Sequence, residues 1–434
     1  MNILLVQPFI IPEIETLTGK LMYSVFRKIS FFDTYLNLQI IAAVTPKEHN
    51  IKFIDERFED IKYEKKYDLI GLTCTTGLSK RAYEIADNFR KMNIPVVIGG
   101  PHVSFLPEEA KQHANAIVIG EGELIWPKLL KDLENGELKP FYKQEKTVNP
   151  AQIPPARRDI IKRGFLPVAR IQATRGCRLN CEFCCVPIIE KKTIRKRPID
   201  EVINELKSIR QKLIIFSDAS LTMDPEYTKN LFRRIKGLHK KFACFGNTDV
   251  LAKDEELLKL AKKAGCHTWH VGFESTSQLV INKLNKYTNT IEEYKTVVKN
   301  IHKNGMAVSG AFIVGFDEDN KDTFKHILQT AIDIKIDLLE INLLTPFPGT
   351  PLYNRLNKEG RILTKDWFHY REGQGLTKTV YQPKNMEPEA LRNGVDWIFW
   401  KWLAPKNQIR LMISAIRYGL FTFLYINFSA HFFL

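Results

Sequence analysis

The 434-residue sequence lacks the cysteine pattern of a disulfide framework, because four of its seven cysteines fall between residues 177 and 185. Its first residues, MNILLVQPF, lack the charged lead and the small-residue cleavage site of a secretory signal. Together these two absences predict a reducing, cytoplasmic setting. Internal repeats and low-complexity tracts are also missing, so a repeat array is excluded.

The charge is unbalanced towards basic residues, with 64 Lys and Arg against 49 Asp and Glu and a net charge of +15. Such a surplus suits nucleic acid, an anionic membrane or an anionic substrate. The basic residues are scattered rather than gathered in one block, so simple solvation of the surface by lysine explains the surplus equally well. The length allows two or three domains.

Short apolar runs alternate with amphipathic stretches over residues 1–140. The runs read as buried strands and the stretches between them, such as 80–92, as helices; the runs are 3–6, 51–54, 69–72, 96–98 and 116–119. This alternation predicts a Rossmann-like, doubly wound parallel sheet. Ligands of such sheets bind at the carboxyl ends of the strands.

Three of these carboxyl ends carry small or polar residues. They are Thr73 to Thr76, Gly99-Gly100-Pro101-His102 and Gly120-Glu121-Gly122-Glu123. Glycines at such positions let the backbone approach a bulky ligand closely. No G-x-G-x-x-G follows the first strand, so a dinucleotide site is not favoured.

The polar, proline-containing residues 141–163 predict a linker, which we bound at 146–163 between domains at 1–145 and 164–372. The alternation of strands and helices then resumes. The predicted strands are 168–173, 213–216, 243–247, 268–273, 307–314 and 338–343, with helices such as 255–264 between them. Six such units predict an incomplete barrel, smaller than the eightfold one.

The remaining residues, 373–434, predict a helical and increasingly apolar C-terminal extension. Residues 418–434 are short for a membrane span, and Asn427 and His431 interrupt their apolar character. Their aromatic residues, with Arg410 and Arg417 nearby, suit a helix that lies in a membrane interface. The alternative is a helix that packs on the barrel.

Cys177, Cys181 and Cys184 form a C-x3-C-x2-C motif after the first predicted barrel strand. Closely spaced thiolates bind zinc or an iron–sulfur cluster. A structural zinc site is normally closed by four protein ligands, and no second C-x2-C or H-x3-H pair follows. Three ligands and one open position therefore favour a 4Fe-4S cluster. The distant Cys74, Cys244 and Cys266 read as small buried hydrophobic residues.

This motif, with the aromatic Phe183 before its last cysteine, resembles that of the radical S-adenosylmethionine (radical SAM) superfamily. The resemblance implies that the iron left free by the three cysteines chelates the amino and carboxylate groups of SAM. It further implies that one electron from the cluster splits SAM into methionine and a 5′-deoxyadenosyl radical, which abstracts a hydrogen atom. The cofactors then carry the difficult chemistry, while the protein orients them and excludes water.

The same resemblance implies which residues contact SAM. Asp218 matches the polar group near the SAM amino group, although Ser217 and Ala219 depart from the Asp-Asp-Asn of many relatives. Glu274 matches the acidic residue aimed at SAM, and its alternative is a solvated Glu at a strand end. The full expected set is Phe183, Asp218, Glu274, Gly310 and Ile313.

An α/β domain ahead of such a barrel resembles the cobalamin-binding class of the superfamily, and 53–57 adds to this resemblance. The implied cobalamin-binding residues are Thr73, Thr75, Gly99, Gly100, Pro101, His102, Gly120, Glu121 and Gly122. The sequence Asp-x-His-x-x-Gly is absent, so we expect no histidine lower ligand from the protein. The alternative is a tight turn at Gly99 and Gly100 in a domain that binds nothing.

We therefore expect a cobalamin-dependent radical SAM enzyme that methylates an unactivated carbon of a hydrophobic, lipid-like substrate. A one-electron donor such as flavodoxin or ferredoxin would reduce the cluster, and the C-terminal tail, residues 409–434, would contact a membrane from the cytoplasmic side.

Three alternatives remain. One is a radical SAM cyclase or oxidoreductase without methyl transfer. Another is a tRNA methylthiotransferase, which the positive charge supports. The methylthiotransferase is disfavoured because the first domain has only Cys74 and the tail is apolar. A nucleic acid is therefore also disfavoured as a partner. The last is a metal-binding scaffold without turnover.

Overall fold

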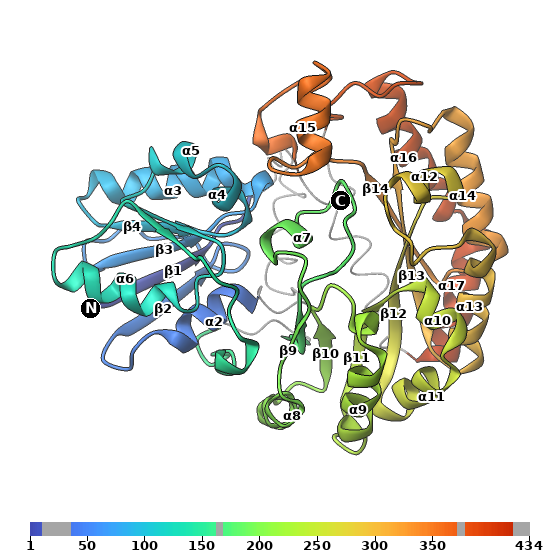
Figure 1. Ribbon diagram of the computed structural model, residues 1–434, viewed down its shortest axis with the longest axis horizontal. Coiled ribbons are helices and arrows are strands. Elements are labelled where there is room, and N and C mark those ends of the chain that lie inside the picture. Colours follow the sequence, from blue (N-terminus) through green and yellow to red (C-terminus); the bar gives the residue numbers. More distant parts are fainter. Residues whose placement is uncertain (11–35, 162–167, 371–377, 420–434) are drawn as a thin grey trace. The chain divides into compact units, whose positions relative to one another are not determined.

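The computed structural model describes residues 1–10, 36–161, 168–370 and 378–419. Two compact units make up the chain, unit 1 from Met1 to Arg170 and unit 2 from Ile171 to Leu434. Both units are α/β structures, each built on a sheet of six strands (Figure 1).

Unit 1 contains a parallel sheet with the strand order β2-β1-β3-β4-β5-β6. The strands are β1 (Asn2–Gln7), β2 (Asn50–Asp55), β3 (Leu69–Thr73), β4 (Val96–Gly99), β5 (Ala116–Ile119) and β6 (Phe141–Lys143). The order changes direction between β1 and β3, which is the switch point where doubly wound sheets bind ligands.

Helices cover both faces of this sheet because successive strand residues point to opposite sides. Leu4 and Val6 pack against α3 (Ser79–Lys91), whereas Ile3 and Leu5 pack against the opposite layer. The other helices are α2 (Leu36–Val44), α4 (Pro101–Phe105), α5 (Pro107–Lys111) and α6 (Ile125–Glu134). The predicted doubly wound sheet is thus confirmed.

The prediction that residues 141–163 form a linker was wrong at its beginning. Phe141–Lys143 is strand β6 and pairs in parallel with β5. Phe141 and Tyr142 pack into the two apolar layers on opposite sides of the sheet. Three residues are too few to show an alternation in the sequence, so only the sheet reveals this strand. The structure describes the linker we bounded at 146–163 as far as residue 161.

The second six-stranded sheet has the order β14-β13-β12-β11-β10-β7. It belongs to unit 2, except that its first strand, β7, begins in the last residues of unit 1. The strands are β7 (Val168–Ile171), β10 (Leu213–Phe216), β11 (Lys241–Gly246), β12 (Cys266–Glu274), β13 (Ala307–Val314) and β14 (Leu338–Leu343). Neighbours from β10 to β14 pair in parallel. A sheet that keeps chain order from first to last strand is the expected partial barrel.

Helices cover one side of this sheet, as the contacts of β12 show. Trp269 contacts Phe232 of α9 (Pro225–Ile235) and Phe273 contacts Tyr294 of α13 (Tyr294–Lys303). The alternate positions, His270, Gly272 and Glu274, therefore lie on the opposite, inner side.

The remaining helices of unit 2 connect the strands or follow the sheet. They are α7 (Val186–Ile189), α8 (Ile199–Ser208), α10 (Thr248–Lys253), α11 (Glu255–Ala264), α12 (Gln278–Lys283), α14 (Lys321–Asp333), α15 (Pro351–Lys358), α16 (Pro388–Trp402) and α17 (Pro405–Tyr418). The expected helical extension is thus observed in α16 and α17, while residues 420–434 lie outside the described residues. In the described part of the chain, no helix combines the length and apolar character needed to cross a membrane.

Candidate active site

The cysteine motif lies in the segment between two short strands that pair antiparallel, β8 (Thr174–Arg175), which follows β7, and β9 (Arg195–Lys196). Gly176 begins this loop with a φ of 91°, and a Cβ at this position would collide with the backbone carbonyl oxygen of Thr193. Only glycine fits a left-handed backbone that passes another chain segment so closely. The loop thus starts in a fixed direction.

The three thiols share one electrostatic environment. Burial raises the pKa of Cys181 to about 12 and that of Cys184 to about 11, and it also raises the pKa of Cys177. The positive charge of Lys286 acts against this effect at all three thiols. Within the described residues, no group of three or more His, Cys, Asp or Glu is arranged as a preformed site for a metal ion. The donors themselves, three soft sulfur atoms that would lose their protons on binding iron, with a cation close enough to offset the resulting charge, fit an iron–sulfur cluster.

Residues of α15 and of the segment after β13 hold the loop between the second and third cysteines. Arg355 of α15 donates from Nη2 to Glu182 Oε1 at 3.0 Å and from Nη1 to Asp317 Oδ2 at 2.8 Å. The amide of Leu352 donates to the Glu182 carbonyl oxygen at 3.0 Å. The ring of Phe183 lies 6.5 Å from that of Phe316. The cysteine loop is therefore tied to the first turns of α15 and to the segment after β13.

Asp317 links this anchor to two further cations. Arg361 and Lys384 contact its carboxylate at 2.8 and 3.1 Å. Burial alone would raise the pKa of Asp317, but Arg361 and Lys384, with Arg355, bring it down to about 2. The carboxylate is thus ionised at neutral pH and can hold Arg355 in place.

Glu274 ends β12 in a strained backbone conformation. Its φ is 64°, which is rare for residues other than glycine, and the register of β12 with β13 shifts beside it. Its buried carboxylate forms an ion pair with Lys286. A Cβ on Gly272 would collide with this carboxylate, so residues 272 and 274 lie on the same side. Backbone strain of this kind collects at functional sites, and the alternative of a solvated strand-end Glu does not describe this residue.

Lys286 keeps its positive charge although it is buried. Burial lowers its pKa, but Glu274, Cys181 and Cys184 raise it, and the pKa ends above its ordinary value. No sequence signal identifies this residue, because a lysine between Asn285 and Tyr287 resembles any surface lysine.

Asp218 is already engaged by the protein. It is buried, and its carboxylate accepts hydrogen bonds from the amides of Ala173 and Thr174 and, at 2.7 Å, from Thr174 Oγ1. Burial raises its pKa to about 6. The structure thus places Asp218 under the strand end that leads into the cysteine loop.

Gly310 and Ile313 lie on opposite sides of β13. A Cβ on Gly310 would meet Ile336 and Phe273 at 2.6 and 2.9 Å, so this glycine makes room for the helix-covered side. Ile313 and Ser309 lie an odd number of positions from Gly310, three and one, so their side chains point to the opposite, inner side of the sheet. Of Gly310 and Ile313, both expected to contact SAM, Ile313 is the one on the side of Glu274.

A polar cluster on the inner side was not predicted. His270 Nδ1 lies 3.5 Å from Glu340 Oε1, which also accepts from Ser309 Oγ, and Phe245 stacks on His270 at 4.8 Å. His270 pairs in register with Phe245 and Ser309 on the adjacent strands. The Glu340 side chain is 42% exposed, so this inner surface offers a carboxylate and an aromatic ring. A sequence signal existed, since these residues share the alternation that identifies Glu274.

In unit 1 the expected residues Thr73, Gly99 and Gly100 come together at the ends of β3 and β4. Thr73 Oγ1 accepts from Asn37 Nδ2 at 2.8 Å. Gly100 has a φ of 111°, and a Cβ there would lie 2.7 Å from the carbonyl oxygen of Cys74. Glycine is therefore required for these two strand ends to meet.

The expected residues next to these two strand ends lie partly on the surface and partly in the interior of unit 1. Thr75 is exposed and Pro101 starts α4, whereas His102 is fully buried. The His102 ring contacts Thr76 Oγ1 at 3.4 Å and Glu109 Oε1 at 3.2 Å. His102 thus packs inside unit 1.

The third expected group, Gly120 to Gly122, adjoins the second through Ser104. Ser104 Oγ donates to the Gly100 carbonyl oxygen at 2.9 Å and accepts from the Gly120 amide at 3.0 Å. Glu121 is buried and accepts from the Val148 amide at 2.8 Å. The two glycine-containing strand ends therefore form one continuous edge, and Glu121 fastens the segment after β6 to it.

The acidic residues at the end of β2 are paired within unit 1. Asp55 accepts from Arg57, and Glu56 forms an ion pair with Arg81, both at 2.6 Å. They stabilise the strand end.

Residues 171–331 match the family model of the Radical SAM superfamily, and residues 33–130 match that of the B12 binding domain. The first match covers the cysteine loop and the barrel strands β10 to β13, and the second covers β2 to β5 of unit 1 with the glycine-containing strand ends.

Curated relatives match this chain over most of its length. The chain is 30% identical over 374 residues, 82% of its length and 79% of the relative's, to bacteriochlorophyllide d C-12(1)-methyltransferase of Chlorobaculum tepidum. It is 25% identical to hopanoid C-2 methylase of Rhodopseudomonas palustris, with 79% and 68% of the two chains covered. An anaerobic magnesium-protoporphyrin IX monomethyl ester cyclase of Cereibacter sphaeroides is 26% identical, with 79% and 62% covered.

Two solved structures share the fold. The cobalamin-dependent S-adenosylmethionine radical enzyme OxsB, with aqua-cobalamin and S-adenosylmethionine bound, has a TM-score of 0.71 at 16% identity and covers 99% of this chain and 73% of its own. The radical S-adenosylmethionine methyltransferase TsrM of Kitasatospora setae, with cobalamin and a [4Fe-4S] cluster bound, has a TM-score of 0.65 at 17% identity and covers 82% and 78%.

Proposed function

This chain belongs to the radical SAM superfamily and carries its B12-binding domain, and we propose that it transfers a methyl group to an unactivated carbon of a hydrophobic small molecule. One observation carries the proposal. A three-cysteine loop in a partial barrel and a B12-binding domain occur together in a chain that is 30% identical, over most of its length, to a C-methyltransferase.

Two relatives support this substrate class. Their names give bacteriochlorophyllide d and hopanoids as the molecules methylated, and both are large and predominantly apolar. The inner side of the barrel supports a substrate with some polar character, because Glu340 and His270 lie beside the exposed ring of Phe245. An apolar molecule with a hydroxyl or amino group fits this surface.

When bound, the iron–sulfur cluster with SAM supplies a carbon-centred radical, and cobalamin supplies the methyl group. Cys177, Cys181 and Cys184 would hold the iron atoms, and Lys286 would offset the negative charge of their thiolates. Glu274, on the same side of β12 as Gly272, would accept hydrogen bonds from the hydroxyl groups of SAM. Arg355 and Asp317 would keep the cysteine loop in position.

In unit 1, the edge formed by Gly99, Gly100 and Gly120 would receive the cobalamin. The glycines expose backbone there, which lets a flat, bulky ligand approach. His102 is held by Thr76 and Glu109 inside the unit, which supports the expectation that the protein provides no histidine below the cobalt.

The remaining partners follow from the same chemistry. A small one-electron donor such as flavodoxin or ferredoxin would reduce the cluster. The hydrophobic substrate and the apolar C-terminal helices support a peripheral contact with a membrane.

The test is an anaerobic reaction that contains cobalamin, a one-electron reductant, SAM with a deuterated methyl group, and membrane lipid extract. We expect a product that carries the deuterated methyl group, together with 5′-deoxyadenosine. If 5′-deoxyadenosine forms together with an altered product that carries no label, the result supports the cyclase or oxidoreductase alternative instead. The similarity to an anaerobic magnesium-protoporphyrin IX monomethyl ester cyclase is the observation that supports cyclisation as a second candidate function.

A further inference from the structure

Helix α17 presents four large apolar side chains on its outward side. With about 100° between successive residues, positions 407, 414 and 418 share one side of the helix, and positions 409, 412, 413 and 416 share the opposite side. The first side packs on the barrel and the second is exposed. Helices of globular proteins usually show the reverse arrangement, with the apolar side towards the core.

Polar and aromatic contacts hold the inward side. Ser414 Oγ donates to Asp337 Oδ1 at 2.6 Å, and Asn407 Nδ2 donates to the Lys401 carbonyl oxygen at 3.0 Å. The ring of Tyr418 stacks on His302 with 5.7 Å between the centroids. The rotation of α17 is therefore fixed by its contacts with α13 and the segment before β14.

The outward side consists of Ile409, Met412, Ile413 and Ile416, which we call the apolar stripe. Ile416 is 83% exposed, the highest value among the exposed large hydrophobic side chains of the described residues. Trp397 and Trp400 are also exposed, at the end of the preceding helix α16.

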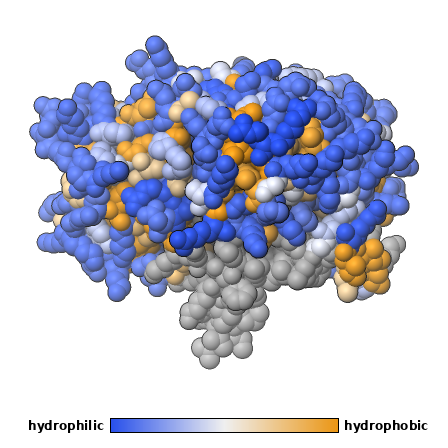
Figure 2. Space-filling view, turned by 90° about the horizontal axis from the view of Figure 1, so that it is seen from below, coloured by the Kyte–Doolittle hydropathy of each residue, from blue (hydrophilic) through white to orange (hydrophobic). Residues whose placement is uncertain are grey.

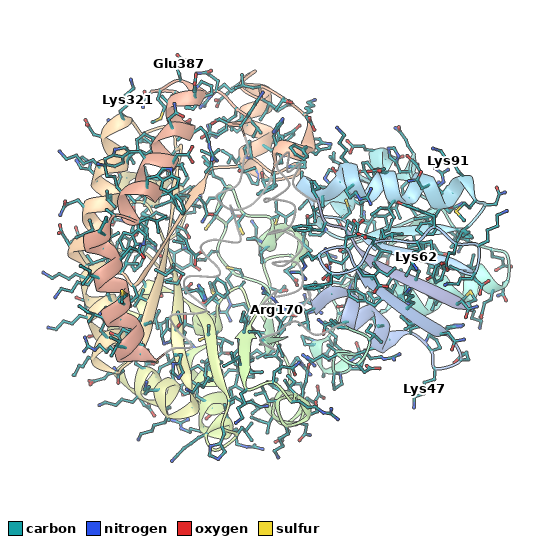
Figure 3. All side chains as sticks on the ribbon, turned by 180° about the vertical axis from the view of Figure 1, so that it is seen from behind. Lys47, Lys62, Lys91, Arg170, Lys321 and Glu387 are labelled. Carbon is teal, nitrogen blue, oxygen red and sulfur yellow. The ribbon has the colours of Figure 1, made fainter. Side chains whose placement is uncertain are left out.

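This concentration is local. Six of the thirteen exposed large hydrophobic side chains in the described residues lie on α16 and α17, although these helices contain only 15 and 14 residues. Figure 3 places Glu387, directly before α16, close to Lys321 at the start of α14, and α16 and α17 continue along the same side of unit 2. In Figure 2, hydrophobic groups interrupt a largely hydrophilic surface. Exposed apolar surface gathered in this way marks a site that another molecule covers.

The charge of the segment identifies the covering molecule. Residues 405–434 contain Lys406, Arg410 and Arg417 but no Asp or Glu, and the whole chain carries a net charge of +15. A second copy of the stripe would bring like charges together, which disfavours self-association. An anionic membrane offers negative charge to the basic residues of the segment and an apolar layer to the side chains of the stripe. Exposed tryptophans are also typical of residues that sit at the level of lipid headgroups.

We propose that the apolar stripe of α17, with Trp397 and Trp400, is a docking surface for anionic lipid membranes. The stripe enters the boundary between headgroups and acyl chains, with α17 parallel to the membrane plane. This inference deepens the proposed peripheral contact and assigns it to α17, within the described residues. It does not depend on whether the enzyme transfers a methyl group.

The experiment is co-sedimentation of the anaerobically purified full-length protein with vesicles. We use phosphatidylcholine alone and phosphatidylcholine with about one quarter phosphatidylglycerol, the latter to provide a negative surface potential. Wild-type protein should bind the anionic vesicles and be released by high salt, because salt screens this attraction. Equal binding to both vesicle types would overturn the electrostatic part of the proposal.

The decisive variant is Ile413→Ser with Ile416→Ser, and its matched control is Leu279→Ser with Tyr287→Ser, at two exposed positions on and after α12. The stripe variant should lose about tenfold or more in vesicle affinity, because it removes two large apolar side chains from the contact. The control should bind as wild type does. Both variants should still cleave SAM, so a loss of binding is distinguishable from a failure of the proposed chemistry.

Two outcomes would overturn the proposal. One is a stripe variant that binds vesicles like wild type, whether or not deletion of residues 420–434 abolishes binding. The other is a wild-type protein that ignores anionic vesicles but dimerises through the stripe, seen as a concentration-dependent mass by light scattering that Ile413→Ser with Ile416→Ser reduces to the monomer.

Discussion

Glu274 and Lys286 form a buried ion pair beside the cysteines, and such pairs are costly to build. Removing two charges from water costs several kcal/mol per ion, which the pair recovers only with good geometry. Glu274 also has a φ of 64°. A residue that combines backbone strain with a buried charge is retained for its position, which here is the inner side of β12.

Asp218 makes the pH dependence of unit 2 testable. Burial raises its pKa to about 6, whereas an unfolded aspartate titrates near pH ~3.9. The folded chain therefore holds this proton more tightly than the unfolded chain. Its contribution to the free energy of unfolding is fully present below about pH 4 and is lost as the pH rises through about 6.

We expect the difference in the free energy of unfolding between wild type and Asp218→Asn to shift by about 3 kcal/mol between pH 4 and 7, with wild type favoured at the lower pH. Urea unfolding of both proteins across this range measures the difference. A constant difference would show that the carboxylate does not titrate as its buried site requires.

At the scale of elements, the cysteine loop is held by two neighbours. Arg355 of α15 joins Glu182 in the loop to Asp317 after β13, and the Leu352 amide holds the Glu182 carbonyl oxygen. The forked guanidinium makes two directed contacts that a lysine cannot reproduce. The cysteines are thus positioned by residues far along the chain, as Arg355 shows with its contact to Glu182 across 173 positions.

Arg355→Lys should loosen the loop and speed the loss of iron to a chelator by about tenfold or more, as other substitutions behind metal ligands do. The control is Lys384→Gln, which removes a partner of Asp317 that lies 3.1 Å away. Iron release followed by absorbance, together with the electron paramagnetic resonance spectrum of the reduced cluster, measures the effect. Equal release from wild type and Arg355→Lys would contradict the anchoring role.

The strands of both sheets could be predicted because alternation and apolar runs are local properties of the sequence. The predicted ranges 213–216, 307–314 and 338–343 coincide with β10, β13 and β14. Strand β6 could not be predicted, because its three residues are defined by pairing with β5. Glu274 could be predicted as a site residue from its place at a strand end. Its partner Lys286 could not, because it lies in a turn after α12.

The candidate site shows the same division. The cysteine spacing is contiguous in sequence and could be recognised directly. Asp218 could be placed at a strand end, but its three hydrogen bonds to Ala173 and Thr174 depend on how β7 and β10 pair. Arg355 and Glu182 are 173 positions apart, so no local pattern connects them.

At the scale of the whole molecule, both units follow one rule. Each has a parallel sheet, and each gathers its candidate site at the carboxyl ends of the strands, the glycine-rich edge in unit 1 and the cysteine loop with Glu274 in unit 2. Basic residues are distributed over the surface, as Lys47, Lys62 and Lys91 of unit 1 illustrate (Figure 3). The charge therefore belongs to the general surface as well as to α17.

The most direct test of the account is SAM cleavage by protein reconstituted without oxygen with iron, sulfide and cobalamin. We predict bound iron and corrinoid in the same sample, and 5′-deoxyadenosine and methionine when a one-electron reductant and SAM are added. Cys181→Ala should abolish this cleavage, while Cys244→Ala, at a buried cysteine remote from the loop in sequence, should retain it. Zinc in place of iron, or cleavage that survives Cys181→Ala, would contradict the account.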